Sequence, residues 1–150
     1  MKGIGIFVLL LVIALGVATF VVTRPPNRHL DAQGRAWVAR FSTWQADVAR
    51  SVDRADVAIG SSTERLSPRL IEPLRSCAAS LARLGAPPSL LSGVLKDANV
   101  ACGEVEYALS VNARYGGPAL ATTKQHLHRA GEWLALAEYN LHQQLGTSGS

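Results

Sequence analysis

The sequence predicts an all-α protein in which an N-terminal transmembrane helix is followed by an up-down-up-down four-helix bundle. Two observations lead to this fold class. An uncharged apolar run occupies residues 3–23, and a run of about twenty residues spans about 30 Å of hydrocarbon as a helix. After residue 28, apolar residues recur every three or four positions without a period-two alternation, which is the pattern of amphipathic helices.

The chain has 150 residues, which is enough for one domain and an anchor. We predict a transmembrane signal anchor at 1–24, a linker at 25–29, a four-helix bundle domain at 30–145 and a disordered tail at 146–150. Clusters of glycine and proline divide the bundle domain into four segments. Short connections between successive helices favour antiparallel neighbours, and hence the up-down-up-down order.

The N-terminal run has two interpretations. Lys2 precedes the run, and Arg24 with two prolines ends it. Residues 16–18 resemble the cleavage site of a secretory signal peptide, but the chain stays apolar beyond them, which favours an uncleaved anchor. The arginines that follow the run would place the bundle in the cytoplasm by the positive-inside rule. The short charged tail before a long apolar run has instead the layout of an export signal.

The first bundle segment, about 30–59, has one apolar stripe and one charged face. The stripe consists of Leu30, Trp37, Phe41, Trp44, Val48, Val52, Ala55 and Ile59. Two surface pairs are expected on the charged face, Asp31 with Arg35 and Asp47 with Arg50. A stripe of this kind forms core. The cluster of Trp37, Phe41 and Trp44 has a second interpretation as a ligand-binding or membrane-surface patch, because it lies close to the predicted membrane exit, where tryptophan is favoured.

The second segment, about 67–84, and the third, about 89–114, each begin at a serine. Ser67 and Ser89 are favoured N-caps, and Pro68 suits a first helical position. Pro73 lies inside the second segment and should kink it or split off its first turn. The connection at 85–88 consists of a glycine, an alanine and two prolines, which predicts a stiff turn.

The fourth segment, about 118–145, has leucines at intervals of seven. These are Leu120, Leu127, Leu134 and Leu141. Ala130 and Ala137 lie between them, and a seam of leucine and alanine lets a partner helix approach closely. We therefore predict a helix-packing seam along this segment.

Cys77 and Cys102 are the two cysteines of the chain, and both lie on apolar stripes of helices expected to be antiparallel neighbours. Counted from the turn, their heights differ by about 7 Å. A bridge therefore requires the connection at 85–88 to climb, or the third helix to start late. Two buried thiols are the alternative. A disulfide is the favoured prediction, and it would place the bundle outside the cytoplasm, because disulfides persist in oxidising compartments.

No recognisable catalytic motif occurs in the sequence. We therefore predict no catalytic residue, no metal site and no cofactor, and we expect that the protein is not an enzyme. A metal module using His126, Glu138 and His142 is a third possibility beside the two functions given below, but two of these ligands on an exposed helix face do not make a site. The net charge of +4 comes from scattered arginines, whereas a nucleic-acid binder shows a denser basic stripe, so no nucleic-acid partner is expected.

Two functional hypotheses follow. The first is a single-pass membrane protein, anchored in the lipid bilayer of the cell membrane, whose extracytoplasmic bundle is an interaction or accessory module of an envelope or membrane complex with an unidentified protein partner. The second is a sensor or carrier of a small apolar ligand or lipid, bound between helices near Trp37 and Trp44. A cytoplasmic bundle with reduced thiols stays open as an alternative location.

Overall fold

The computed structural model describes residues 30–60 and 65–146, and within these ranges every regular element is a helix. The elements are α2 (Ala32–Gly60), α3 (Pro68–Arg75), α4 (Cys77–Ala82), the 3-10 turn η1 (Ser89–Leu91), α5 (Ser92–Tyr115), the 3-10 turn η2 (Gly117–Ala119) and α6 (Leu120–Leu145). A single residue separates α3 from α4, so these two elements form one broken segment. The described chain thus contains four helical segments, and the predicted all-α class is confirmed.

Several predicted features lie outside the described residues. They are the anchor at 1–24, the linker at 25–29 and residues 147–150 of the tail, and residues 61–64 are also outside the described ranges. Within the described ranges, no helix combines the length and the apolarity that are needed to cross a bilayer. Gly146, the first residue of the predicted tail, follows α6 with a left-handed φ of 71°, which is a usual glycine conformation at a helix C-terminus.

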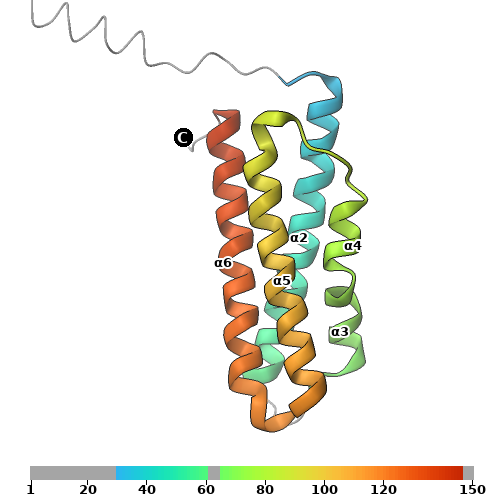
Figure 1. The fold of residues 1–150 in the computed structure, drawn as a ribbon, viewed down its shortest axis with the longest axis vertical. Helices are drawn as coiled ribbons and strands as arrows, with labels where there is room; N and C mark the ends of the chain where they lie inside the picture. Colours follow the sequence, from blue (N-terminus) through green and yellow to red (C-terminus); the bar gives the residue numbers. More distant parts are fainter. Residues whose placement is uncertain (1–29, 61–64, 147–150) are drawn as a thin grey trace, which may run out of the picture.

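The four segments run antiparallel to their neighbours (Figure 1). α2 packs against α6 and against α3 and α4, and α5 packs against α6 and against α3 and α4. The segments therefore form a ring of four, in which α5 and α6 make the most extensive pair. The start of α2 and the end of α6 lie at the same end of the bundle (Figure 1), so the described chain enters and leaves on one side.

The start of α2 is capped by a carboxylate. Asp31 precedes the helix, and its Oδ1 accepts a hydrogen bond of 2.6 Å from the backbone N–H of Gly34, which satisfies one of the unpaired donors at the N-terminus. Arg35 donates instead to the carbonyl oxygen of Leu30, at 2.6 Å. The expected ion pair of Asp31 with Arg35 is therefore replaced by a cap, whereas the expected pair of Asp47 with Arg50 is present.

The second segment is divided in two, but the break lies at Ser76, after Pro73 and two turns into the segment rather than after its first turn. Proline lacks an N–H and its ring crowds the preceding turn, so a helix that contains it is weakened there. Ser67 and Pro68 occupy the predicted first positions of α3, although the Ser67 side chain makes no capping hydrogen bond. The third and fourth segments each begin with a 3-10 turn, so α5 and α6 start slightly later than predicted.

The core follows the predicted stripes. Its largest fully buried side chains include those of Trp37, Phe41, Leu74, Leu81, Leu91, Leu127 and Leu134. Alanines at 98, 101 and 108 on α5 and at 130 and 137 on α6 are fully buried. Because alanine keeps backbones close, this composition accounts for the extensive contact between α5 and α6.

Candidate functional site

The cysteine pair connects the broken segment to α5. Cys77 is the first residue of α4 and Cys102 lies inside α5, and their Cα atoms are 5.5 Å apart at disulfide distance. Both residues are buried. The connection after α4 climbs along the bundle before α5 begins (Figure 1), and α5 starts at Ser92 rather than at Ser89. The two conditions predicted for a bridge are thus both met.

The pair joins elements that are short by themselves. α3 has 8 residues and α4 has 6, whereas isolated helices below about 12–15 residues are marginal in water. Packing and the cross-link therefore hold this segment in place. A hollow of about 450 Å³ lies beside the pair, between the broken segment and α5, and includes Leu74, Leu109 and Glu106 in its lining.

The three aromatic residues of α2 lie in the core. Trp37 and Phe41 stack with ring centroids 5.0 Å apart, and Phe41 and Trp44 are tilted at 5.5 Å. Their exposed fractions are 2%, 0% and 7%. A membrane-surface role for this cluster therefore has almost no exposed ring area to support it. Trp37 and Trp44 instead lie at the base of two hollows beside α2, and Phe41 is fully buried between them.

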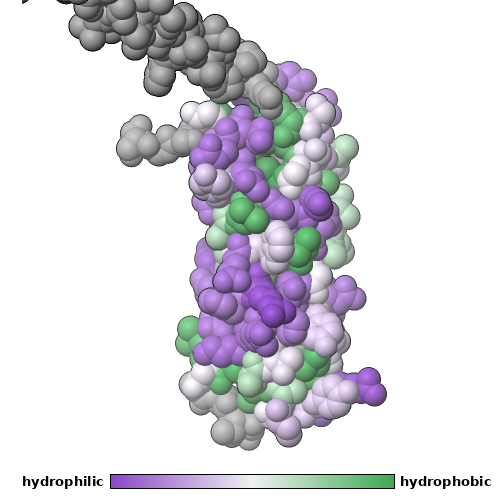
Figure 2. Space-filling model, turned by 60° about the vertical axis from the view of Figure 1, so that its left-hand side comes forward, coloured by the Kyte–Doolittle hydropathy of each residue, from purple (hydrophilic) through white to green (hydrophobic). Residues whose placement is uncertain are grey.

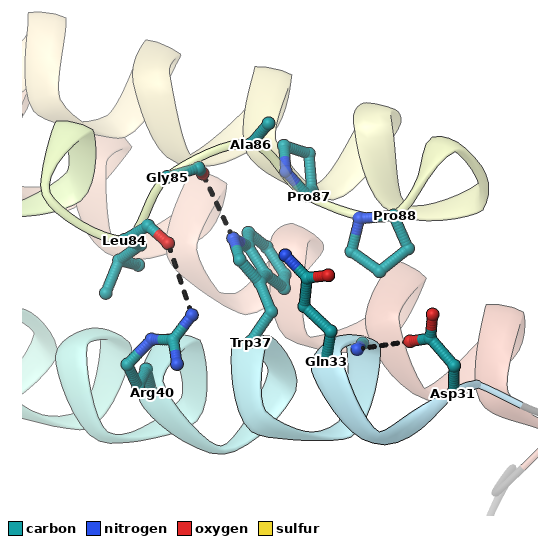
Figure 3. Close-up of a pocket in the computed structure, with 10 residues that line it drawn as sticks. Asp31, Gln33, Trp37, Arg40, Leu84, Gly85, Ala86, Pro87 and Pro88 are labelled. Atoms are coloured by element: carbon teal, nitrogen blue, oxygen red, sulfur yellow. Dashed lines mark hydrogen bonds between the residues drawn. The ribbon is translucent and has the colours of Figure 1, made fainter.

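Each tryptophan of the cluster uses its indole N–H to hold the opposite wall. Trp37 Nε1 donates to the carbonyl oxygen of Gly85 at 3.1 Å (Figure 3). Trp44 Nε1 donates to Ser80 Oγ at 2.9 Å, and this hydroxyl donates in turn to the carbonyl oxygen of Cys77 at 2.9 Å. Buried indole N–H groups generally find such partners. The tryptophans thus fix the distance between α2 and the segment from α4 to the connection.

Two hollows lie along this contact and share Arg40 and Leu84. The first is about 380 Å³ and lies between the start of α2 and residues 84–88 (Figure 3). The second is about 520 Å³, open to solvent, and lies between α2 and α4. We call the two together the tryptophan groove. Its principal lining residues are Trp37, Arg40, Trp44, Ser80, Arg83 and Leu84.

The tryptophan groove is lined by two arginines and two carboxylates, Asp31 and Asp47. Arg40 and Arg83 line it and are exposed, and within residues 30–60 and 65–146 neither guanidinium forms an ion pair with a carboxylate. Arg40 reaches the carbonyl oxygen of Leu84 at 3.4 Å (Figure 3). The groove carboxylate of Asp47 is paired with Arg50. The Asp31 carboxylate caps the start of α2. The two arginines are therefore without an ion-pair partner, while both carboxylates of the lining are engaged within α2.

In the half of the bundle formed by α2, α3 and α4, basic side chains outnumber carboxylates. Residues 30–60 and 65–84 carry eight arginines and five carboxylates, whereas residues 89–146 carry four lysines and arginines and five carboxylates. Figure 2 shows the side on which α6 lies, where hydrophilic residues cover most of the surface and hydrophobic residues form separate groups. The basic character thus belongs to the side of α2, α3 and α4.

The leucine seam of α6 is buried inside the bundle. Leu127, Leu134 and Leu141 are at most 3% exposed, and Leu120 is at 9%. α2 contributes a buried polar contact to this region. Gln45 Nε2 donates to the carbonyl oxygen of Leu134 and to Glu138 Oε2, each at 3.1 Å. The seam therefore packs against helices of the same chain.

His126 and His142 of α6 each lie close to a glutamate. His126 Nδ1 lies 2.5 Å from Glu104 Oε2 on α5, and the ring of Tyr107 packs on His126 with centroids 4.3 Å apart. His142 Nε2 and Glu138 Oε1 are 3.8 Å apart. His126 and Glu138 are separated by twelve residues of one helix, about 18 Å, so these three residues do not converge. Among the described residues, no group of three His, Cys, Asp or Glu side chains is placed to hold a metal ion.

Three residues of this site escaped the sequence reasoning. Ser80 lies on α4 and Arg83 directly follows this helix. No periodic pattern shows that they lie on the side of α4 that faces Trp44 and Arg40. Gln45 carried a usable signal, because a glutamine beside Trp44 and one turn before Val48 occupies a position at the edge of an apolar stripe. A buried amide requires hydrogen-bond partners, which predicts a polar contact with another helix.

Comparison of the chain with protein-family models, with curated proteins and with solved structures finds no match.

Proposed function

We propose that the chain is a single-pass membrane protein whose anchor holds the four-helix bundle outside the cytoplasm, as an interaction or accessory module of an envelope or membrane complex. The observation that carries the location is the Cys77–Cys102 pair, with Cα atoms 5.5 Å apart. Disulfides persist in oxidising compartments. The apolar run at 3–23 supplies the anchor.

The interaction role is supported by apolar side chains that the bundle leaves exposed. The large ones are Val57, Tyr107, Tyr115, Leu136 and Tyr139. Four of these five belong to α5 and α6, and three are tyrosines, which are enriched at protein interfaces. The less basic half of the bundle therefore carries the residues that suit a protein partner. This side is the partner-facing side in our proposal.

The location is tested by labelling the thiols of intact cells with a membrane-impermeant maleimide, before and after impermeant reductant. We expect labelling of the full chain after reduction and none before it. Labelling that appears only after the membrane is permeabilised would place the bundle in the cytoplasm. A Cys77→Ala and Cys102→Ala double variant is the control for labelling of other proteins.

The partner-facing side is tested with a photo-crosslinking amino acid placed at Tyr107 or Tyr139, and at Arg54 as a matched exposed position on the basic half. We expect one adduct of constant mass from the tyrosine positions and none from Arg54. A Tyr107→Ser and Tyr139→Ser double variant should lose co-purification of the same protein. An equal adduct from all three positions, or none from any, would contradict the proposal.

A second candidate function, a sensor or carrier of an apolar ligand or lipid, is favoured by the tryptophan groove. Trp37 and Trp44 line its two hollows of about 380 and 520 Å³, a size that suits small-molecule sites. Tryptophan fluorescence of the full chain, titrated with a panel of lipids and small apolar molecules, tests this function. A flat response across the panel would count against it.

A further inference from the structure

We propose that the tryptophan groove binds the headgroup of an anionic phospholipid, with Arg40 and Arg83 pairing the phosphate and the partly exposed Leu84, Pro87 and Pro88 contacting the glycerol and upper acyl region. This inference rests on the second candidate function and names its ligand class. It follows from the charge of the groove, from the nature of its walls and from its place in the bundle.

The two arginines of the groove favour an anionic ligand. Arg40 and Arg83 both line the hollow between α2 and α4, and within the described residues neither one has a carboxylate partner. A guanidinium offers five N–H donors, so the long contact from Arg40 to the Leu84 carbonyl oxygen leaves most of its donors available. Two guanidiniums on one groove match the several acceptor oxygens of a phosphate.

The apolar residues that line the groove favour an amphiphilic ligand over a free ion. Leu84 supplies apolar surface beside the two arginines, and the connection adds Pro87 and Pro88 at one end (Figure 3), whereas Trp37 and Trp44 are buried at the base of the two hollows. The two carboxylates of the lining are engaged within the fold: Asp31 caps α2 and Asp47 pairs with Arg50.

The position of the groove brings it within reach of a bilayer. α2 begins at residue 32, and the predicted anchor ends at residue 24. The five residues 25–29 span at most about 18 Å, and Trp37 lies about 10 Å along the helix from residue 30. The groove therefore opens near the tethered end of the bundle, on its more basic half. Juxtamembrane basic residues attract anionic lipid.

The proposal is tested with the full chain in dodecyl maltoside micelles, carrying Trp133→Phe so that the fluorescence comes from Trp37 and Trp44. The titrants are dihexanoylphosphatidylglycerol, dihexanoylphosphatidylcholine and inorganic phosphate. We expect a saturable change with the anionic lipid, and half-saturation at least about tenfold higher in an Arg40→Gln and Arg83→Gln double variant, since charge-assisted hydrogen bonds are lost.

A matched control is available because Arg54 and Arg69 are exposed on the same half and do not line either hollow. The Arg54→Gln and Arg69→Gln double variant removes the same charge, and its half-saturation should stay within about twofold of the parent. Equal losses in both double variants would show diffuse attraction and overturn the site. Equal binding of phosphatidylcholine would overturn charge recognition while leaving a lipid carrier in place.

Two further outcomes are decisive. Saturation by inorganic phosphate at the same concentration as the anionic lipid would show that the apolar wall contributes nothing, and would overturn the lipid assignment. No response to any titrant would overturn both the assignment and the carrier function. The interaction module is tested separately by crosslinking, so these failures do not bear on it.

Discussion

Removal of the Cys77–Cys102 cross-link should cost a large part of the stability of the bundle. The two residues are separated by 25 positions, and on the chain-entropy account a loop of this size contributes about 3.5 kcal/mol. Small domains are stable by only about 5–15 kcal/mol in total. Because α3 and α4 are short and broken at Ser76, the described elements offer this segment little helical stability of its own.

The assay is urea unfolding of the full chain in dodecyl maltoside, followed by tryptophan fluorescence. The three tryptophans, Trp37, Trp44 and Trp133, all lie within the bundle, so the signal reports the bundle rather than the anchor. With a urea dependence of about 1–3 kcal/mol per molar, reduction should lower the midpoint by about 1–3 M. Oxidised and reduced forms of the same chain are the matched pair.

The Cys77→Ala and Cys102→Ala double variant separates two contributions. It loses the loop constraint and also two buried sulfur atoms, whose burial contributes about 1 kcal/mol each. Its midpoint should therefore lie below that of the reduced parent. A midpoint for the reduced parent within about 0.3 M of the oxidised form would refute the reasoning, because it would show that the denatured chain gains no freedom when the loop opens.

Three further predictions concern single contacts, each measured as a urea midpoint against the parent. Trp44→Phe and Ser80→Ala should each lower the free energy of unfolding by about 1 kcal/mol. The double variant should cost little more than either one, because both remove the bond of 2.9 Å from Trp44 Nε1 to Ser80 Oγ. Full additivity of the two costs would contradict the bond. Leu134→Ala should cost about 2–5 kcal/mol, whereas Leu136→Ala, at a residue that is 40% exposed, should cost less than about 1 kcal/mol. Gly85→Ala should cost about 1 kcal/mol because its φ of 78° is unfavourable for alanine; an unchanged midpoint would show that the connection relaxes without cost.

The helices and the cysteine pair were accessible from the sequence because both depend on local spacing. Stripes of period 3.6 predicted the faces that α2 and α6 bury, and the count from the turn set the condition under which Cys77 and Cys102 could meet. The break at Ser76 was accessible only in part, since Pro73 weakens the helix but does not determine where the next turn starts. The 3-10 starts of α5 and α6 depend on packing at the bundle ends, which the sequence does not show.

The tryptophan groove was less accessible, for a physical reason. Periodicity shows which face of α2 is apolar, but it does not show how α4 is rotated about its own axis. That rotation places Ser80 within hydrogen-bond distance of the Trp44 indole and Arg83 in the lining of the same hollow as Arg40. It is set by the sum of the contacts of α4 with α2 and α5, and a helix of 6 residues has no long stripe that would reveal it. The aromatic cluster itself was ambiguous, because one stripe can face a core or a lipid headgroup until its neighbours are known.

The cross-link and the groove depend on the same short helix. Ser80, Arg83 and Leu84 form one wall of the groove. Cys77, the first residue of α4, is joined to Cys102 of α5 by the disulfide. The hydroxyl of Ser80 donates to the carbonyl oxygen of Cys77 while it accepts from Trp44. A displacement of Cys77 therefore moves the acceptor on which the Trp44 contact is built. Because α4 by itself is too short to keep its position, the disulfide stabilises the bundle and also sets the position of the groove wall that carries Arg83.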